Sequence, residues 1–223
     1  MTLSRDTPRA PGQFIVFEGG DGAGKGSALA AAAEALRADG LEILTTREPG
    51  GTEEGMALRG LLLSEAGRVW DQGSELLLMT AARVQHVKRV IRPAVLAGKI
   101  VLCDRYLGST LAYQGGGRGL PPSLILGLHR DFVEDYQPDL TVLMDVDPAV
   151  ALGRSRSRLA ALGADEGRFE SLDLSFHQRA RASFLEQAQA APDRTLVVDA
   201  AAPLDAVQSA VLAGLRAWLQ NPL

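Results

Sequence analysis

The sequence predicts an α/β protein in three layers, with a five-stranded, mainly parallel sheet flanked by helices. Two observations carry this prediction. Short apolar runs of strand length alternate along the chain with longer segments of helical periodicity, which is the order of elements in parallel α/β sheets. In addition, a glycine-rich segment at 19–25 joins the first apolar run directly to a helix, a junction typical of nucleotide-binding α/β proteins.

The five expected strands are short segments bounded by glycine, proline, polar or charged residues. They are FIVFE at 14–18, LEILTT at 41–46, IVLC at 100–103, LTVLM at 140–144 and TLVV at 195–198. Most of them are nearly continuous in apolar residues, which is typical of strands buried on both faces of a parallel sheet.

Helical segments lie between these strands. The segment at 27–39 is rich in alanine and leucine and is expected to stop at Gly40. The longest helical pattern covers 74–97, with Ser74 as the expected N-cap and Gly98 as the stop. The remaining helices are expected at 121–133, from 148 towards 159 after an Asp147–Pro148 start, at 171–190 and at 204–219.

Three segments between these elements are expected to be irregular because of their glycine and proline content. They are 47–55, 115–119 and 160–167. The last of them, together with the end of the helix before it, is expected to form a short lid at about 153–170.

The length of 223 residues fits one domain. We expect residues 1–13 to form a flexible N-terminal tail and residues 14–223 to form that domain. Cys103 is the one cysteine, which fits a reducing compartment. The N-terminus lacks the apolar core of a secretory signal, and no apolar run reaches the about 18 residues of a membrane span. We therefore expect a cytoplasmic protein without membrane contact.

The charge balance limits the class of partner. The chain carries 23 basic and 27 acidic residues, a formal net charge of -4. This balance argues against a broad nucleic-acid-binding surface, because phosphate contacts along nucleic acid need a positive footprint. It leaves room for a local basic cleft.

A phosphate-binding loop is predicted at the end of the first strand. Its glycines let backbone N–H groups turn inward around a triphosphate, the helix N-terminus adds partial positive charge, and Lys25 reaches the β- and γ-phosphates. The chain is therefore expected to have the P-loop NTPase form of the α/β fold. The residues expected to hold ATP are Gly19, Gly20, Asp21, Gly22, Ala23, Gly24, Lys25, Gly26 and Ser27.

The magnesium ion that accompanies ATP has less regular candidate ligands. This motif places Ser or Thr after its lysine, but here Gly26 follows Lys25 and the hydroxyl comes one place later, on Ser27. Asp104 and Asp145 each end an apolar strand, where a carboxylate holds magnesium directly or through water; an ordinary turn aspartate is the alternative. Beside a phosphate loop, we expect Asp104 and Ser27 to be the ligands.

Three arginines are placed to bind an acceptor phosphate. Arg47 and Arg105 follow strands, and ligands of open α/β sheets bind beyond the carboxyl ends of the strands. Arg83 lies inside the long helix among apolar neighbours. Planar guanidinium groups suit two-point phosphate contacts, although an ordinary surface arginine is the alternative for each.

Arg154, Arg156 and Arg158 lie in the helix that leads to the expected lid. At about 100° per residue, Arg154 and Arg158 share a helix face and Arg156 points away. One interpretation is a solvated helix face. The other is a mobile lid that brings an arginine over the phosphates, where phosphoryl transfer needs charge stabilisation.

These segments together resemble the thymidylate kinase family of P-loop nucleoside monophosphate kinases, over about residues 14–219. The combination of TREPGG with DRY…STxAYQGxGRG is specific to that family. The segments are FIVFEGGDGAGK (14–25), TREPGGT (46–52), AARVQHV (81–87), VLCDRYLGSTLAYQGGGRGL (101–120), PDLTVLMDVDP (138–148), and GRSRSR (153–158) followed by RFE (168–170).

The resemblance implies an enzyme that transfers the γ-phosphate of ATP to dTMP, giving ADP and dTDP, with magnesium. Its substrates would be dTMP and ATP, with no nucleic acid or membrane as partner, and family members usually form homodimers through helices beside the active site. The helix at 74–97 is compatible with such an interface.

The resemblance also assigns roles to residues. Asp21 matches an acid at the sugar 3'-hydroxyl, Arg47 and Arg105 match arginines at the dTMP phosphate and transferred group, and Arg83 matches the arginine at the thymine edge. Glu48–Pro49 matches a peptide bond that is typically cis in the family. The segment lining the base and sugar is matched by Ser109, Thr110, Tyr113 and Gln114.

Two departures from the family pattern stand out. Some members carry a catalytic arginine in the loop where this chain has Gly22, and others carry basic residues in the lid. This chain fits the second group, so we expect Arg156 first, and Arg154 or Arg158 otherwise, to be catalytic beside Lys25 and Arg105. Met79 stands where a phenylalanine often stacks on thymine, and a methionine still packs against a ring.

Two other functions remain open. Another small kinase on the same fold would share the loop, and its acceptor preference would differ. A nucleotide-binding regulatory protein without turnover is motivated by Gly26. The three histidines have no acid or cysteine at metal-ligand spacing and are interpreted as structural or surface residues.

Overall fold

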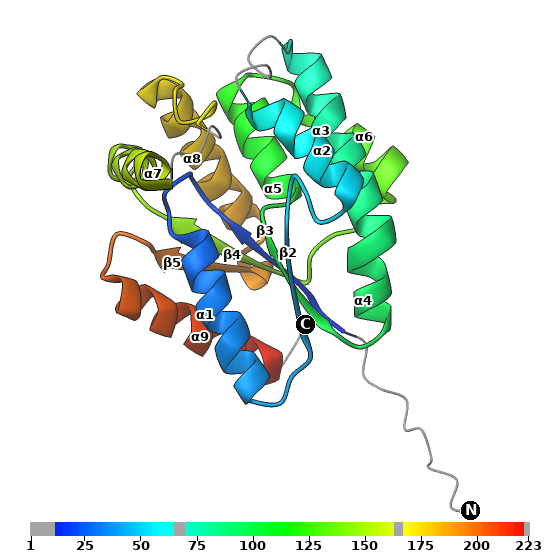
Figure 1. The fold of residues 1–223 in the computed structure, drawn as a ribbon, viewed down its shortest axis with the longest axis vertical. Helices are drawn as coiled ribbons and strands as arrows, with labels where there is room; N and C mark the ends of the chain where they lie inside the picture. Colours follow the sequence, from blue (N-terminus) through cyan, green and yellow to red (C-terminus); the bar gives the residue numbers. More distant parts are fainter. Residues whose placement is uncertain (1–11, 65–69, 163–166, 221–223) are drawn as a thin grey trace, which may run out of the picture.

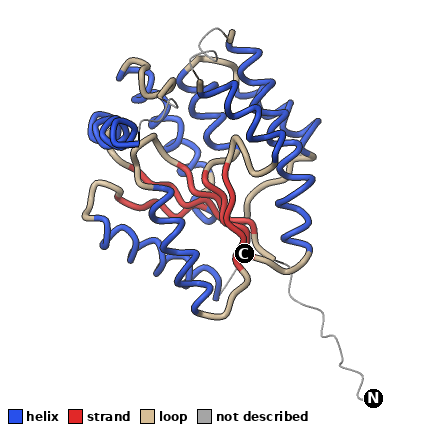
Figure 2. The backbone as a smooth tube through the Cα atoms, in the orientation of Figure 1, coloured by secondary structure: helices blue, strands red, loops and turns tan. Residues whose placement is uncertain are grey.

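A computed structural model of the chain describes residues 12–64, 70–162 and 167–220, and for 158–162 the backbone alone. Its strands form a sheet that lies between helices (Figure 2). The strand order is β2-β3-β1-β4-β5, and all four pairings are parallel. The predicted α/β class and five-stranded sheet are confirmed. The strands are β1 (Phe14–Glu18), β2 (Ile43–Arg47), β3 (Ile100–Asp104), β4 (Leu140–Asp145) and β5 (Thr195–Asp199).

Alternate side chains of β1 enter two different cores. Ile15 and Phe17 pack against α1 (Lys25–Ala38) and α9 (Leu204–Gln220) on one face. Phe14 and Val16 face the opposite side, which is covered by α3 (Gln72–His86), α4 (Arg92–Leu96) and α6 (Pro122–Val133) (Figure 1). Because a strand alternates its side chains between faces, a continuously apolar strand needs a helix layer on each side. This is the predicted three-layer arrangement.

The long helix predicted at 74–97 begins earlier and is interrupted. Its N-cap is Asp71, whose Oδ1 accepts hydrogen bonds from the backbone of Gly73 at 2.8 Å and Ser74 at 3.0 Å, so the prediction of Ser74 as the cap is wrong. Aspartate and serine are comparable caps, and sequence spacing alone did not separate them. After α3 the chain makes one π-helical turn, η2 (Val87–Ile91), before α4.

A helix that was not predicted begins inside the segment expected to be irregular at 47–55 and continues beyond it. Residues 47–55 contain the loop, but α2 (Glu53–Leu63) already begins within it. Thr52 caps this helix by accepting a hydrogen bond from the backbone N–H of Gly55 at 2.9 Å, and Glu53 and Glu54 stabilise its positive end.

The prediction that 115–119 forms no regular element is wrong for 115–117 and correct for 118–119. Helix α5 (Leu107–Thr110) continues into the π-helix η3 (Leu111–Gly117), which packs along α8 (Leu174–Ala190). The glycines permit this close packing. A Cβ at Gly117 would lie 2.3 Å from the ring of Phe176, and one at Gly116 would lie 2.9 Å from the Cβ of Ser183.

The remaining elements frame the expected lid. Helix α7 (Pro148–Leu162) starts at the predicted Asp147–Pro148 signal, and Asp147 Oδ1 accepts from Ala149 N at 2.8 Å. Residues 163–166 of the expected lid lie outside the described residues. The short η4 (Pro192–Arg194) precedes β5. Among the described helices, none is long and apolar enough to cross a membrane.

The domain begins slightly before residue 14. Gly12 N donates to the carbonyl of Val95 at 3.0 Å, and Val101 N donates to the carbonyl of Gln13 at 2.8 Å. The predicted tail is therefore two residues too long at its inner end. Residues 1–11, the rest of that tail, lie outside the described part of the chain.

Candidate active site

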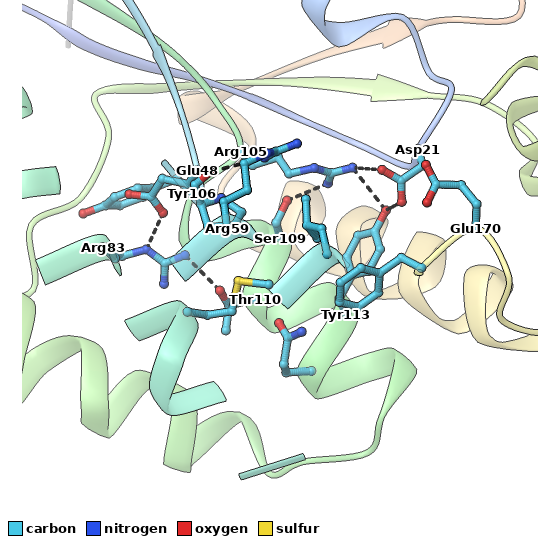
Figure 3. Close-up of a pocket in the computed structure, with 15 residues that line it drawn as sticks. Asp21, Glu48, Arg59, Arg83, Arg105, Tyr106, Ser109, Thr110, Tyr113 and Glu170 are labelled. Carbon is cyan, nitrogen blue, oxygen red and sulfur yellow. Dashed lines mark hydrogen bonds and ion pairs between the residues drawn. The ribbon is translucent and has the colours of Figure 1, made fainter. Parts of the chain in front are cut away.

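The main pocket lies beyond the carboxyl ends of β1 and β3, where the topology of an open α/β sheet predicts a ligand. It encloses about 780 Å³, including its open mouth, within the range of small-molecule sites. Figure 3 shows its lining residues. Those predicted from sequence are Asp21, Glu48, Pro49, Met79, Arg83, Arg105, Ser109, Thr110, Tyr113 and Gln114.

The predicted phosphate loop connects β1 to α1 with three glycines in positive-φ conformations, at Gly19, Gly22 and Gly24. Gly22 also marks a close contact, because a Cβ there would lie 1.8 Å from the carbonyl oxygen of Ala151 on α7. No side chain fits at this position. Any arginine acting on the phosphates must therefore come from elsewhere in the chain.

Lys25 lies in the centre of this loop, with only 6% of its surface exposed. Its Nζ donates to the carbonyls of Gly19 at 3.0 Å and Gly20 at 2.8 Å. Burial, reinforced by the nearby charge of Arg105, lowers the Lys25 pKa to about 8 against the attraction of nearby acids. Among the described residues its hydrogen-bond partners are these two carbonyls, and a buried ammonium held in this way is well prepared to exchange them for a phosphate.

Arg105 joins the phosphate loop to the pocket. It follows β3 in a left-handed conformation, with φ of 72°, which is strained for a residue with a side chain. Its Nη1 donates to the Gly19 carbonyl at 3.1 Å. Its Nη1 also donates to Ser109 Oγ at 2.9 Å, and its Nη2 pairs with Asp21 Oδ1 at 2.5 Å (Figure 3). The guanidinium is thus fixed between the two halves of the site.

Asp21 is ionised in this arrangement. Burial alone would raise its pKa, but the charges of Arg105 and Lys25 and a hydrogen bond from Tyr113 outweigh burial and lower the pKa to about 2. The Tyr113 hydroxyl donates to Asp21 Oδ2 at 2.7 Å. Asp21 therefore presents a fixed negative charge at the edge of the pocket.

A second buried ion pair lies deeper in the pocket. Arg83 Nε donates to Glu48 Oε2 at 2.8 Å, and Arg83 Nη2 donates to Thr110 Oγ1 at 2.9 Å (Figure 3). Behind them, His86 contacts Glu48 Oε1 through Nδ1 at 3.0 Å and Thr46 Oγ1 through Nε2 at 2.7 Å. The structural role expected of His86 is confirmed.

The same pair fixes the charge of Glu48. Burial would raise the Glu48 pKa, yet the Arg83 charge and the His86 contact outweigh burial and lower it. The Glu48–Pro49 peptide bond is cis, as the family resemblance implies.

The lid arginines diverge. Arg156 Nη2 donates to the carbonyl of Glu170 at 3.1 Å, and Glu170 lines the pocket. Arg154 instead donates to the carbonyls of Ala200 at 2.7 Å and Ala201 at 3.3 Å, after β5. The Arg158 side chain lies outside the described part of the chain. Of the two arginines whose side chains are described, Arg156 is the one that reaches a pocket-lining residue.

Arg47 is not brought into the pocket. It is exposed at the end of β2 and lines a separate open groove with Thr52, Glu53 and Met56. Its contact with the acceptor phosphate therefore stays a prediction. Successive residues of an extended chain point to opposite sides, and here the next residue, Glu48, lines the main pocket while Arg47 lines the groove.

The candidate metal ligands differ in their surroundings. Asp104 Oδ1 is buried and has no hydrogen-bond partner in the described part of the protein, which suits a cation or its bound water. Ser27 is exposed on α1. Asp145 is already engaged, since both its oxygens accept from Arg181, at 2.7 and 2.8 Å. No cluster of three or more His, Cys, Asp or Glu ligands occurs among the described residues.

Several site residues were missed in the sequence. Arg59 and Leu63 share one face of α2 and both line the pocket, so a prediction of that helix would have placed them. Tyr106, Phe169 and Glu170 also line it. The last two lie in the RFE segment but carried no signal of their own.

Glu18 is another missed residue, and it supports the Arg105 turn. Its Oε1 accepts from the backbone N–H of Tyr106 at 2.9 Å and Ser109 at 3.0 Å, and its Oε2 accepts from Ser109 Oγ at 2.5 Å. Burial raises the Glu18 pKa in spite of these bonds and the Arg105 charge. A polar residue ending a buried strand was the available signal.

Comparison with known proteins agrees with this geometry. The profile of the family described as "Thymidylate kinase" matches residues 17–211. Among curated relatives, a thymidylate kinase of Cereibacter sphaeroides is 52% identical over 210 residues, 94% of this chain and 97% of the relative. One of Magnetococcus marinus is 46% identical over 200 residues, 90% of this chain and 93% of the relative.

A solved structure agrees in the same way. The crystal structure of thymidylate kinase from Ehrlichia chaffeensis superposes with a TM-score of 0.74 at 33% identity, over 92% of this chain and 99% of that one. The phosphate loop, the arginine-lined pocket and these matches lead to one conclusion: the chain belongs to the thymidylate kinase family.

Proposed function

We propose that this protein transfers the γ-phosphate of ATP to dTMP, giving ADP and dTDP. The observation that carries the proposal is the position of Arg105. Its Nη1 donates to Gly19 of the phosphate loop, and its Nη2 pairs with Asp21, which lines the main pocket. One guanidinium therefore contacts both the donor site and the acceptor site, where the transferred phosphoryl group needs charge stabilisation.

The donor phosphates are assigned to the loop. Backbone N–H groups from Gly19 to Lys25 and the N-terminus of α1 would surround the β- and γ-phosphates. The Lys25 ammonium, now bonded to two loop carbonyls, would turn to the phosphate oxygens. Phosphoryl transfer needs positioning and charge more than covalent chemistry, and these groups supply both.

The acceptor is assigned to the main pocket. Arg105 would hold the dTMP phosphate, and Asp21 would accept a hydrogen bond from the sugar 3'-hydroxyl. Arg83 and Gln114 would meet the base edge, with Met79 against the ring. This arrangement accounts for the mix of apolar walls and a few fixed polar groups that line the pocket.

Arg156 is proposed as the lid residue that stabilises the transferring group. Support comes from two observations: Gly22 leaves no room for a side chain in the loop, and Arg156 bonds to Glu170 at the pocket wall. The Arg154 contacts after β5 point to a structural role for that side chain.

Magnesium is proposed as the metal ion of the reaction. The unpartnered, buried Oδ1 of Asp104 fits the ion or one of its waters, and Ser27 remains the candidate hydroxyl. When bound, the ion would neutralise negative charge on the ATP phosphates. Gly26 leaves open space at the usual hydroxyl position.

We also infer a cytoplasmic homodimer. Helices α2, α3 and α6 lie side by side (Figure 1) and expose Leu61, Leu77 and Leu124, each more than 45% exposed. Large exposed apolar side chains on adjacent helices are typical of an interface. Sedimentation is expected to give twice the monomer mass of 23.6 kDa. A monomer at micromolar concentration would contradict the homodimer.

The cytoplasmic location rests on Cys103, which is buried and free.

The proposed reaction is tested with a panel of acceptors. ADP release from ATP is measured with dTMP, dUMP, dCMP, AMP and GMP as the varied substrate. The account predicts the highest kcat/KM for dTMP. A preference for another monophosphate would assign the chain to a different kinase specificity. Binding of ATP and dTMP with no turnover at saturating magnesium would instead indicate a regulatory protein.

A further inference from the structure

A buried carboxylate, Glu75, lies behind the pocket at the centre of a charged cluster. Its side chain is fully buried in α3. Its Oε1 accepts from Gln114 Nε2 at 2.8 Å and from Arg118 Nε at 3.3 Å. Its Oε2 accepts from Arg118 Nη2 at 3.0 Å and from Arg168 Nη2. A charge buried this deeply is stable only if it is paired and hydrogen-bonded, and here two guanidinium groups and one amide satisfy it.

This cluster fixes the orientation of the Gln114 side chain. Both oxygens of the Glu75 carboxyl group act as hydrogen-bond acceptors towards these neighbours. The amide of Gln114 must therefore turn its NH2 group towards Glu75. Its carbonyl oxygen, Oε1, has no partner in the described part of the chain, and Gln114 lines the pocket. Glu75 thus leaves an acceptor, and not a donor, for a ligand.

Arg83 provides the complementary group on the same wall. Its guanidinium is held by Glu48 and by Thr110, and Thr110 precedes Gln114 by four residues, about one helical turn. Arg83 is a donor only. The wall therefore presents a fixed donor beside a fixed acceptor. With thymine or uracil, Arg83 can donate to the 4-keto oxygen and Gln114 can accept from N3–H. Cytosine has a 4-amino donor and an unprotonated N3 acceptor at these positions, so neither hydrogen bond can form.

We propose that Glu75 is a positioning residue for base specificity, which orients the Gln114 amide so that the pocket accepts 4-keto pyrimidines and rejects cytosine. The proposal rests on the proposed function, because it assumes that the pocket holds the acceptor base. Glu75 does not touch the base. It acts through Gln114.

Replacing Glu75 by glutamine is expected to turn the Gln114 amide over, so that a hydrogen-bond donor faces the pocket in place of an acceptor. Glutamine has one acceptor oxygen in place of two. The charged Arg118 donates to both carboxylate positions, and its shorter contact, from Nη2 at 3.0 Å, favours the oxygen at the Oε2 position over the contact from Nε at 3.3 Å. The new NH2 group would then face Gln114, whose amide would turn over and present its own NH2 to the pocket. A donor at this point suits the N3 of cytosine.

The variant must keep the buried charges balanced. Glu75→Gln alone leaves Arg118 and Arg168 without a counter-charge, so the test uses Glu75→Gln with Arg168→Met. The remaining Arg118 side chain is 20% exposed and reaches water. Arg168→Met alone is the matched control, since it keeps Glu75 and its bond to Gln114.

The readout is the ratio of kcat/KM for dUMP to kcat/KM for dCMP, because these acceptors differ only at the base edge in question. The ratio is expected to fall at least about tenfold in the double variant and to change little in Arg168→Met, while the dTMP to dUMP ratio stays the same in both. An unchanged dUMP to dCMP ratio in a folded double variant would overturn the inference. An unmodified enzyme inactive on dTMP and dUMP would refute the proposed function itself.

A second measurement needs no change at Glu75. In the 15N-labelled unmodified protein, the side-chain NH2 signal of Gln114 is assigned by its loss in Gln114→Leu. We expect that signal to be slowly exchanging with solvent without ligand and to keep its shift when dTMP binds, because it faces Glu75 in both states. Fast exchange without ligand, or a large shift on binding, would mean that the NH2 group faces the base and would refute the inference.

Discussion

At the residue scale, the charge of Lys25 depends on pH in the range where the enzyme would be assayed. Burial lowers its pKa to about 8 in the absence of phosphates. The pH dependence of kcat/KM reports ionisations of the free enzyme, so kcat/KM for ATP is expected to fall as pH rises through about 8. In the ATP complex the negative triphosphate favours the charged form of Lys25, so kcat is expected to stay high to a higher pH. The measurement is a pH–rate profile with ATP as the varied substrate.

The control is Lys25→Arg, which stays charged throughout and should lack the inflection near pH 8 even if its activity is low. A profile for the unmodified enzyme that stays level to pH 10 would contradict the burial of Lys25. The lowered pKa of Lys25 also affects the stability of the fold, which changes with pH in the opposite direction to kcat/KM. Below about pH 8 the folded protein contains Lys25 as a buried cation, whereas in the unfolded chain this cation is hydrated, so burial lowers the free energy of unfolding. This penalty disappears as pH rises from about 8 towards 10.5, the ordinary pKa of lysine.

Gly26 permits a second residue-scale prediction. A Cβ at this position meets no atom within 4 Å, so Gly26→Ser restores the loop hydroxyl without steric cost. We expect the magnesium concentration for half-maximal activity to fall, because the hydroxyl adds a ligand where the ion is proposed to lie. Titration of activity with magnesium at fixed ATP measures this.

Gly60→Ser provides the matched control, since Gly60 is a helical glycine on α2 that also has open space around it. It is expected to leave the magnesium dependence unchanged. If Gly26→Ser also left it unchanged, Ser27 or water would already complete the magnesium shell.

At the scale of elements, α7 is expected to deliver one arginine to the reaction. Arg156→Ala should lower kcat at least about a hundredfold and change dTMP affinity little, because a lid contact strengthens in the transition state. Arg154→Ala, which removes contacts to Ala200 and Ala201, should have a much smaller effect on kcat. Steady-state kinetics of the two variants measure this difference in kcat. An unchanged kcat in Arg156→Ala would reject the catalytic role of Arg156.

The packing of η3 on α8 gives a prediction about stability. Gly117→Ala places a methyl group 2.3 Å from the Phe176 ring, so we expect the free energy of unfolding to fall by about 1–3 kcal/mol. Gly60→Ala, in open space, should raise it by about 0.5–1 kcal/mol through helix propensity. Urea unfolding compares the two, and equal effects of the same sign would mean that η3 and α8 are not in close contact.

These elements also show where sequence reasoning stops. The strands were predictable because their apolar runs need only a local pattern. The helical form of 111–117 was not, since its glycines look like loop residues until α8 is known to press against them. Likewise, the start of α3 depended on a choice between Asp71 and Ser74, which cap helices about equally well.

At the scale of the whole molecule, the site forms because parallel strands end at one edge of the sheet. Asp21, Arg105 and Glu48 follow three different strands, β1, β3 and β2, and all line one pocket. The phosphate loop was predictable, since its chemistry lies in consecutive residues. Arg47 lines a separate groove although the next residue lines the pocket, because neighbouring residues of an extended chain point to opposite sides. Glu75 acts through contacts distant in sequence, to Gln114, Arg118 and Arg168, and had no local signal.

The central claim is that the phosphoryl group leaving ATP arrives on dTMP in this pocket. The most direct test follows the reaction by 31P NMR with ATP, magnesium and dTMP. The account predicts that the β-phosphate signal of dTDP rises in equal amount with ADP as the dTMP signal falls. ADP without dTDP would show that the γ-phosphate goes to water, and an unchanged spectrum would show no transfer; either result would contradict the claim.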